Sequence, residues 1–215
     1  MKKNFKLIIS YIIRLSLLVA VAREAHVHQY AFAFFSSLAF FASFLPGILA
    51  RNAKIILPTE MELTALFFIY IGLFLGEAHN LYDVFPWLDI VLHLTSGIIM
   101  GLVGFFIVYI LNTDPKTHIK MEPLFVAVFS FTFSMSIGAI WEIVEFSLDT
   151  LYAGLNMQKS GLADTMGDLI MDFSGAMIVA IMSYFYLKKN EKGRILNWIK
   201  KRIAHHNPKI FGAFR

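Results

Sequence analysis

Long apolar runs are the feature that most limits what this chain can fold into. A helix needs about 20 mostly apolar residues to cross a bilayer core about 30 Å thick. Hydrophobic residues make up 58% of the 215 positions and charged residues 16%, whereas soluble domains hold about 45–50% and about 25%. The sequence therefore predicts an all-α, polytopic membrane helix bundle with about six transmembrane helices. The predicted spans are residues 5–22, 30–50, 61–78, 88–111, 123–148 and 167–187.

The distribution of basic residues predicts that both termini are cytoplasmic, because Lys and Arg collect on the cytoplasmic side of membrane proteins. Nine basic residues follow position 187, and the outer loops hold only Arg23 and Lys159. This pattern predicts a multi-pass protein of the plasma (inner) membrane. A second interpretation of the start is a cleaved signal peptide, since MKKNFK is a basic leader and residues 20–22 read Ala-Val-Ala.

We expect one transmembrane domain over residues 1–187 and a basic cytoplasmic tail over residues 188–215. In the tail, Ile195, Trp198, Ile199 and Ile203 recur at helical spacing. That pattern is typical of an amphipathic helix on the anionic inner leaflet, and a solvated tail that only sets topology is the alternative. The expected partners are membrane lipids. No nucleic acid is expected as a partner, and the sequence leaves the oligomeric state open.

Acidic and histidine side chains gather at the outer ends of the last four predicted spans. They fall mostly at helical spacings of three, four or seven, which places the members of a group on one helix face. Because a carboxylate within hydrocarbon costs at least a few kcal/mol, we expect these groups to face the bundle interior and to partner each other. The groups are Glu77 with His79, Asp89 with His93, Glu142 with Glu145 and Asp149, and Asp164 with Asp168 and Asp172.

A divalent metal would explain this gathering of acids, because like charges this close cannot all be ionised without a counter-charge. Carboxylates with imidazole suit Zn, Mg, Mn or Ca, in an order that the sequence does not fix. The chain has no cysteine, which excludes thiolate ligands and thiolate nucleophiles. We predict His93, Asp168, Asp172 and Asp89 as metal ligands, Glu142 and Glu145 as catalytic residues, and Trp141, Asp149, Asp164, Glu77 and His79 as supporting residues.

Simpler roles exist for some of these residues. Asp149 and Asp164 lie near helix ends, where Asp commonly belongs to a loop or caps a helix, and Asp89 can do the same. Arg14, within the first span, can neutralise an acid or reach the interface. Glycines at 97, 101 and 104 predict a close helix contact along the fourth span.

Three segments resemble the YjdF-type small multi-pass bacterial inner-membrane proteins, a domain of unknown function. They are YDVFPWLDIVLHLTSGIIMG, AIWEIVEFSLDTLYAG and LADTMGDLIMDFSGA, and the resemblance covers roughly residues 70–180. Gly167 and Leu94 depart from the Trp and the aromatic residue that the family pattern leads us to expect. The resemblance implies a shared site without naming its reaction. It carries over to Asp89, His93, Trp141, Glu142, Glu145, Asp164, Asp168, Asp172 and Gly175.

Three functions are compatible with this pattern, and the sequence leaves open whether the chain is an enzyme. The first is a metal-dependent, hydrolase-like enzyme acting on lipid or lipid-linked substrates at the outer face. The second is an ion- or proton-coupled transporter, which the apolar inner halves of the spans disfavour. The third is a non-catalytic membrane assembly protein in which the acids serve helix packing.

Overall fold

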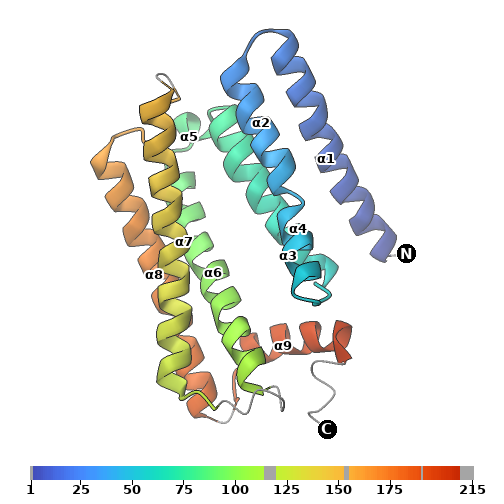
Figure 1. Ribbon diagram of the computed structural model, residues 1–215, viewed down its shortest axis with the longest axis vertical. Coiled ribbons are helices and arrows are strands. Elements are labelled where there is room, and N and C mark those ends of the chain that lie inside the picture. Colours follow the sequence, from blue (N-terminus) through green and yellow to red (C-terminus); the bar gives the residue numbers. More distant parts are fainter. Residues whose placement is uncertain (1, 114–119, 153–154, 190, 209–215) are drawn as a thin grey trace. The chain divides into compact units, whose positions relative to one another are not determined.

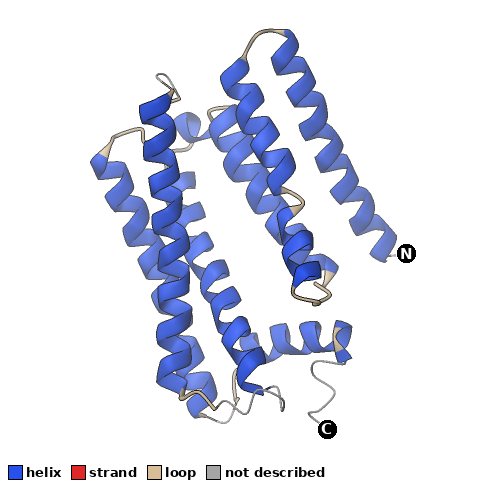
Figure 2. Cartoon of the chain, viewed as in Figure 1, coloured by secondary structure: helices blue, strands red, loops and turns tan. Residues whose placement is uncertain are grey.

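A computed structural model describes residues 2–113, 120–152, 155–189 and 191–208 of the chain. Six of its helical stretches are long and apolar enough to cross a membrane, which confirms the predicted all-α polytopic class. Figure 2 shows helices joined by short connections, with no strand in the described part of the chain. The six stretches are Phe5–His26, Tyr30–Asn52, Thr59–Ala78, Trp87–Asn112, Pro123–Leu151 and Leu162–Lys188.

The chain divides into two compact units, which we describe separately. The first unit comprises Met1–Trp87 with His205–Asn207, and the second comprises Leu88–Ala204 with Pro208–Arg215. The predicted boundaries at residues 187 and 188 and the orientation of the termini stay predictions.

In the first unit, α1 (Lys2–His26) and α2 (Tyr30–Ala42) form an antiparallel helical hairpin (Figure 1). The predicted span over residues 30–50 corresponds to the stretch Tyr30–Asn52. It is not one continuous helix, because the chain turns at Ser43 and Phe44 before α3 (Leu45–Asn52) begins. Pro46 lies in the first turn of α3, and its missing N–H is tolerated only at such a helix start.

The third span is a composite of α4 (Thr59–Ile69) and a π-helix, η1 (Tyr70–Ala78), and it is followed by the short α5 (Leu81–Val84). The Tyr82 hydroxyl donates a hydrogen bond to the Gly72 carbonyl at 3.2 Å. The Tyr82 ring also occupies the space that a Cβ at Gly76 would need, with its nearest carbon 2.3 Å from that position. The wider π turn is therefore packed around a tyrosine that follows it in the chain.

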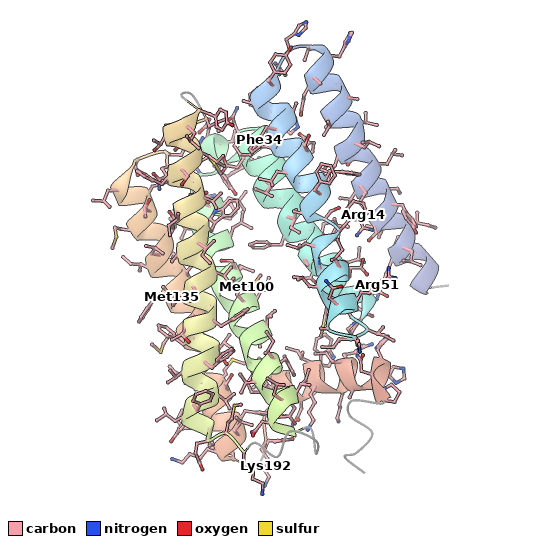
Figure 3. The ribbon with its side chains drawn as sticks, viewed as in Figure 1. Arg14, Phe34, Arg51, Met100, Met135 and Lys192 are labelled. Atoms are coloured by element: carbon pink, nitrogen blue, oxygen red, sulfur yellow. The ribbon has the colours of Figure 1, made fainter. Side chains whose placement is uncertain are left out.

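Arg14 pairs with an acid inside the first unit, as one of its two predicted roles required. Its guanidinium donates to the Ser43 carbonyl at 2.9 Å and lies 3.5 Å from Glu62 Oε1. Figure 3 labels this side chain on α1. The charge of an intramembrane arginine is thus compensated within the unit.

The second unit is built on α6 (Trp87–Thr113), α7 (Pro123–Leu151) and α8 (Leu162–Lys188), which run antiparallel in succession (Figure 1). α8 begins at Leu162, five positions before the expected start at 167, because its first turns carry acids that the apolar criterion left out. Large apolar side chains such as Ile143, Phe146 and Ile170 are exposed, as expected for surfaces that face lipid.

Glycines let these three helices approach closely, which confirms the predicted contact along α6. A Cβ at Gly97 would lie 2.5 Å from the Asp172 carbonyl oxygen, and one at Gly175 would lie 2.3 Å from the Leu94 carbonyl oxygen. Gly138 of α7 is equally constrained, because its Cβ would lie 2.4 Å from Asp172 Oδ2. The missing side chains of Gly97 on α6 and Gly138 on α7 therefore leave the space that Asp172 fills.

The tail forms α9 (Arg194–His206), which lies across the direction of α6–α8 (Figure 1). Glu191 fastens it to the bundle, because Tyr109 donates a hydrogen bond to Glu191 Oε1 at 2.8 Å and Lys200 pairs with Oε2. Leu196 and Ile203 are buried, whereas Ile195 and Trp198 are exposed. The predicted helix in the tail is confirmed, and its binding to the anionic leaflet stays a proposal.

Replacing Gly175 with Ala should destabilise the protein, because the new methyl group must push α8 away from the α6 backbone. We expect the free energy of unfolding to fall by about 1–3 kcal/mol, measured by denaturant or thermal unfolding in detergent. Gly167→Ala is the matched control on the same helix, since nothing lies within 4 Å of its Cβ position. Equal stability of the two variants would contradict the close contact.

Single-cysteine labelling tests the orientation, because the natural chain contains no cysteine. In intact cells, a membrane-impermeant maleimide should label Gln29→Cys, in the turn between α1 and α2. Lys192→Cys, before α9, should react only after the membrane is permeabilised, since the Lys and Arg bias places the tail inside. The reverse pattern would overturn the predicted topology.

Candidate functional site

His93 of α6 is the centre of a buried cluster to which α6, α7 and α8 all contribute. Its Nε2 atom lies 3.7 Å from Asp89 Oδ1, 4.0 Å from Glu142 Oε1 and 4.0 Å from Asp168 Oδ1. These separations exceed the usual hydrogen-bond range of about 2.7–3.2 Å. One ring nitrogen therefore faces three carboxylates without hydrogen bonding to any of them.

The other ring nitrogen of His93 has a fixed partner. Nδ1 lies 3.2 Å from Asp172 Oδ2, and the Ser96 hydroxyl donates a hydrogen bond to Asp172 Oδ1 at 2.6 Å. This geometry assigns a ring proton to Nδ1, donated to Asp172. In a neutral imidazole the lone pair is then on Nε2 and points toward Asp89, Glu142 and Asp168. Metal-binding histidines are commonly oriented by a carboxylate in this way.

Glu142 presents an unusual buried carboxylate to the same space. Neither of its oxygens has a partner at close hydrogen-bond geometry among the described residues, and the residue is 4% exposed. The hydroxyl of Thr165, near the start of α8, contributes only a weak side-chain hydrogen bond to this carboxylate. Buried ionised groups are normally paired, hydrogen-bonded or bound to a metal, so the incomplete hydrogen bonding of Glu142 leaves room for either a proton or a bound cation.

The spacing of the donors is close to that of a metal site. Asp89, His93 and Asp168 each offer one ligand atom, and these atoms lie within 4.8 Å of one another. Two ligands about 2.1 Å from a tetrahedral ion lie about 3.4 Å apart, so the distances of 3.7 and 4.0 Å from His93 need to shrink by only tenths of an ångström. The nitrogen and oxygen donors suit Zn²⁺ or Mn²⁺.

The cluster is buried at its base and reaches the surface at one edge. The side chain of Asp89 is 23% exposed, whereas those of His93 and Asp168 are 8% and 6% exposed. Asp89 lies in the first turn of α6, so the opening is at the end of the bundle that the sequence predicts to be the outer one.

The structure brings Asp89, His93, Glu142, Asp168 and Asp172 together, as the sequence predicted. Asp172 faces Nδ1 of His93 and lies outside the three-residue ligand group. Its geometry therefore favours an orienting role over the predicted role as a metal ligand. Glu145 is buried on the same face of α7 as Glu142, and Trp141 is half-buried beside it.

Asp149 and Asp164 both hold the connection between α7 and α8. The carboxylate of Asp149 accepts hydrogen bonds from the backbone N–H groups of Met157 and Gln158, at 2.8 and 2.9 Å. Asp164 accepts one from the Lys159 N–H at 3.1 Å, whereas Gly161 occupies the N-cap position of α8. Their geometry matches the simpler loop roles open to them from the sequence.

His79 and Glu77 belong to the first unit, where His79 has a partner that sequence reasoning missed. His79 Nε2 lies 3.6 Å from Oε1 of Glu24, a residue that is 1% exposed. Glu24 follows the buried Leu17 by seven positions, so extending the helical periodicity of α1 past residue 22 could have found it. Thr165 was also missed, because no spacing rule distinguishes it from other hydroxyls.

A family model described as "Predicted membrane protein (DUF2238)" matches residues 6–189. The chain belongs to this family. The match confirms the expected kind of family, a multi-pass membrane protein without an assigned reaction, and supports the plasma-membrane location. An "Uncharacterized protein" of Thermotoga maritima is 28% identical over 142 residues, covering 66% of this chain and 70% of the relative. No solved structure matches.

Metal binding by this cluster can be measured directly on the detergent-purified protein. We expect elemental analysis after Zn²⁺ or Mn²⁺ loading to find about one ion per chain, and Asp168→Asn to abolish this binding because one of the protein ligands is lost. Asp164→Asn, four positions earlier on the same helix, should retain the ion.

Asp172→Asn tests the orienting role. It should weaken metal affinity roughly 10–100-fold without abolishing it, as expected when the partner of a ligand histidine is altered. A complete loss equal to that of Asp168→Asn would make Asp172 a ligand, and unchanged binding in Asp168→Asn would contradict the site.

Proposed function

We propose that this protein is a membrane-embedded, metal-dependent hydrolase whose site lies among α6, α7 and α8. The observation that carries the proposal is the position of Glu142, a buried carboxylate with no partner at close hydrogen-bond geometry among the described residues, whose Oε1 lies 4.0 Å from Nε2 of His93 in the group formed with Asp89 and Asp168. In this proposal the three residues hold a divalent cation such as Zn²⁺, Mn²⁺ or Mg²⁺. When bound, such an ion supplies Lewis-acid polarisation and a compensating charge.

The residues around that group have separable roles. Glu142 acts as a general base that takes a proton from an attacking water, since Thr165 supplies only a weak hydrogen bond to its oxygens. Asp172 holds the imidazole of His93 through Nδ1, and Ser96 holds Asp172. Asp89, at the exposed edge, is where a substrate approaches.

The surroundings favour a substrate with a lipid part. Ile90 and Ile143, on the helices that carry Asp89 and Glu142, are 46% and 63% exposed. These surfaces face acyl chains, so a substrate dissolved in the bilayer can reach the site from the side. We therefore propose a lipid or lipid-linked substrate, cleaved near the outer headgroups.

The interior of the second unit supports an enzyme more than a transporter. Between the cluster and Tyr109, the buried side chains of the described residues are apolar, such as Phe105, Val126 and Val179, or are serines. A path for ions or protons normally carries ionisable groups through the membrane. This arrangement supports a site open toward one side.

Replacing Glu142 with Gln tests the catalytic proposal, because the amide has nearly the same shape and cannot accept the proton. With a panel of phospholipids and lipid-linked phosphates, we expect hydrolysis by the purified protein to fall by about 10²–10⁴-fold, with the thermal unfolding temperature maintained. Glu122→Gln, at the opposite end of α7, is the matched control and should retain activity. The measurement is product release by mass spectrometry.

Three results would contradict the proposal. Equal processing of the whole panel by wild-type and Glu142→Gln protein would remove the catalytic role. Saturable metal uptake by proteoliposomes that depends on Asp168 would favour the transporter. Acid-to-amide variants that change only stability, with no metal bound, would favour the assembly protein.

A further inference from the structure

An apolar groove runs between the N-terminal part of α7 and the C-terminal part of α8, at the opposite end of the unit from the acid cluster. Its volume is about 290 Å³. The small side chains of Ala127 and Ala180 line it and are almost fully buried. Larger lining side chains stand on both helices, including Leu124 and Val128 on α7 and Ile181 and Phe185 on α8.

Two lysines stand at the end of this groove. Lys188 Nζ donates a hydrogen bond to the Tyr184 hydroxyl at 3.0 Å and lies 5.1 Å from the centre of its ring. Lys189 Nζ lies 5.8 Å from the centre of the Phe185 ring. Both rings line the groove, so both ammonium groups are folded back over it.

Among the described residues, these lysines have no anionic partner. Both are exposed, and no acid among the described residues pairs with either ammonium group. Within the part of the chain that the structure describes, their side-chain contacts are to aromatic rings and a hydroxyl, which carry no negative charge. The groove is therefore apolar and large enough for part of an acyl chain. Two lysine side chains lie at its end, where α8 leaves the hydrocarbon core of the membrane.

We propose that this groove is a binding site for an anionic phospholipid. One acyl chain lies between α7 and α8, and the phosphate of the headgroup lies between Lys188, Lys189 and the Tyr184 hydroxyl. Lysine and tyrosine at the membrane interface are the side chains expected to contact a lipid phosphate. The apolar groove provides affinity for any acyl chain, and the two charges provide selectivity for an anionic headgroup.

Native mass spectrometry of the full-length chain in detergent tests the site with phosphatidylglycerol and phosphatidylcholine of identical acyl chains. We expect wild-type protein to bind phosphatidylglycerol more tightly. The Lys188→Gln/Lys189→Gln variant should bind it roughly 30-fold more weakly, because two cations near an anionic headgroup are lost. Lys192→Gln is the matched charge control, since this side chain points away from the helices at the same end of the unit (Figure 3).

A second pair of variants tests the groove itself. Ile181→Trp fills the groove and should weaken binding of both lipids. Ile178→Trp is the control and should leave binding unchanged, because it adds the same bulk on an exposed side of α8 that does not line the groove. Thermal unfolding checks that each variant is folded. Equal affinity for the two lipids, or an equal loss in Lys192→Gln, would overturn the proposal and leave only general attraction to a basic tail.

Discussion

The cost of placing carboxylates in a low-dielectric interior is the constraint on which the second unit depends. Asp89, Glu142 and Asp168 surround one nitrogen of His93, and Asp172 holds the other. Such groups are tolerated only when they are paired, protonated or bound to a cation. Asp172 is satisfied by Ser96 and His93, whereas among the described residues Glu142 has only a weak hydrogen bond from Thr165. We therefore expect a bound cation and the proposed reaction on the Nε2 side of His93, where Asp89, Glu142 and Asp168 lie.

Much of this arrangement follows from periodicity and composition. The apolar runs predict the six spans, and spacings of three and four residues predict which face of each helix carries acid. The burial of Glu142, Asp168 and Asp172 follows from the expense of exposing them to lipid. A family match over residues 6–189 is consistent with one membrane architecture for these features.

Other features depend on contacts that periodicity does not contain. Helical spacing places Asp168 and Asp172 on one face, but the rotation of α8 against α6 decides that they approach different nitrogens of His93. The π-helix in the third span depends on the packing of Tyr82, which lies beyond its end. Periodicity can place Glu24 on the buried face of α1, but it does not reveal its partner His79, which lies more than fifty positions away in the sequence.

Gly138 has a consequence that reaches beyond helix packing. It stands one turn before Glu142 on α7, and the carboxylate of Asp172 fills the space where its side chain would be. The same contact thus sets how far apart two helices stand and where the imidazole of His93 is held. A genetic screen for inactive variants that still insert into the membrane should therefore recover Gly138→Ala as readily as substitutions that remove the carboxylates of the cluster.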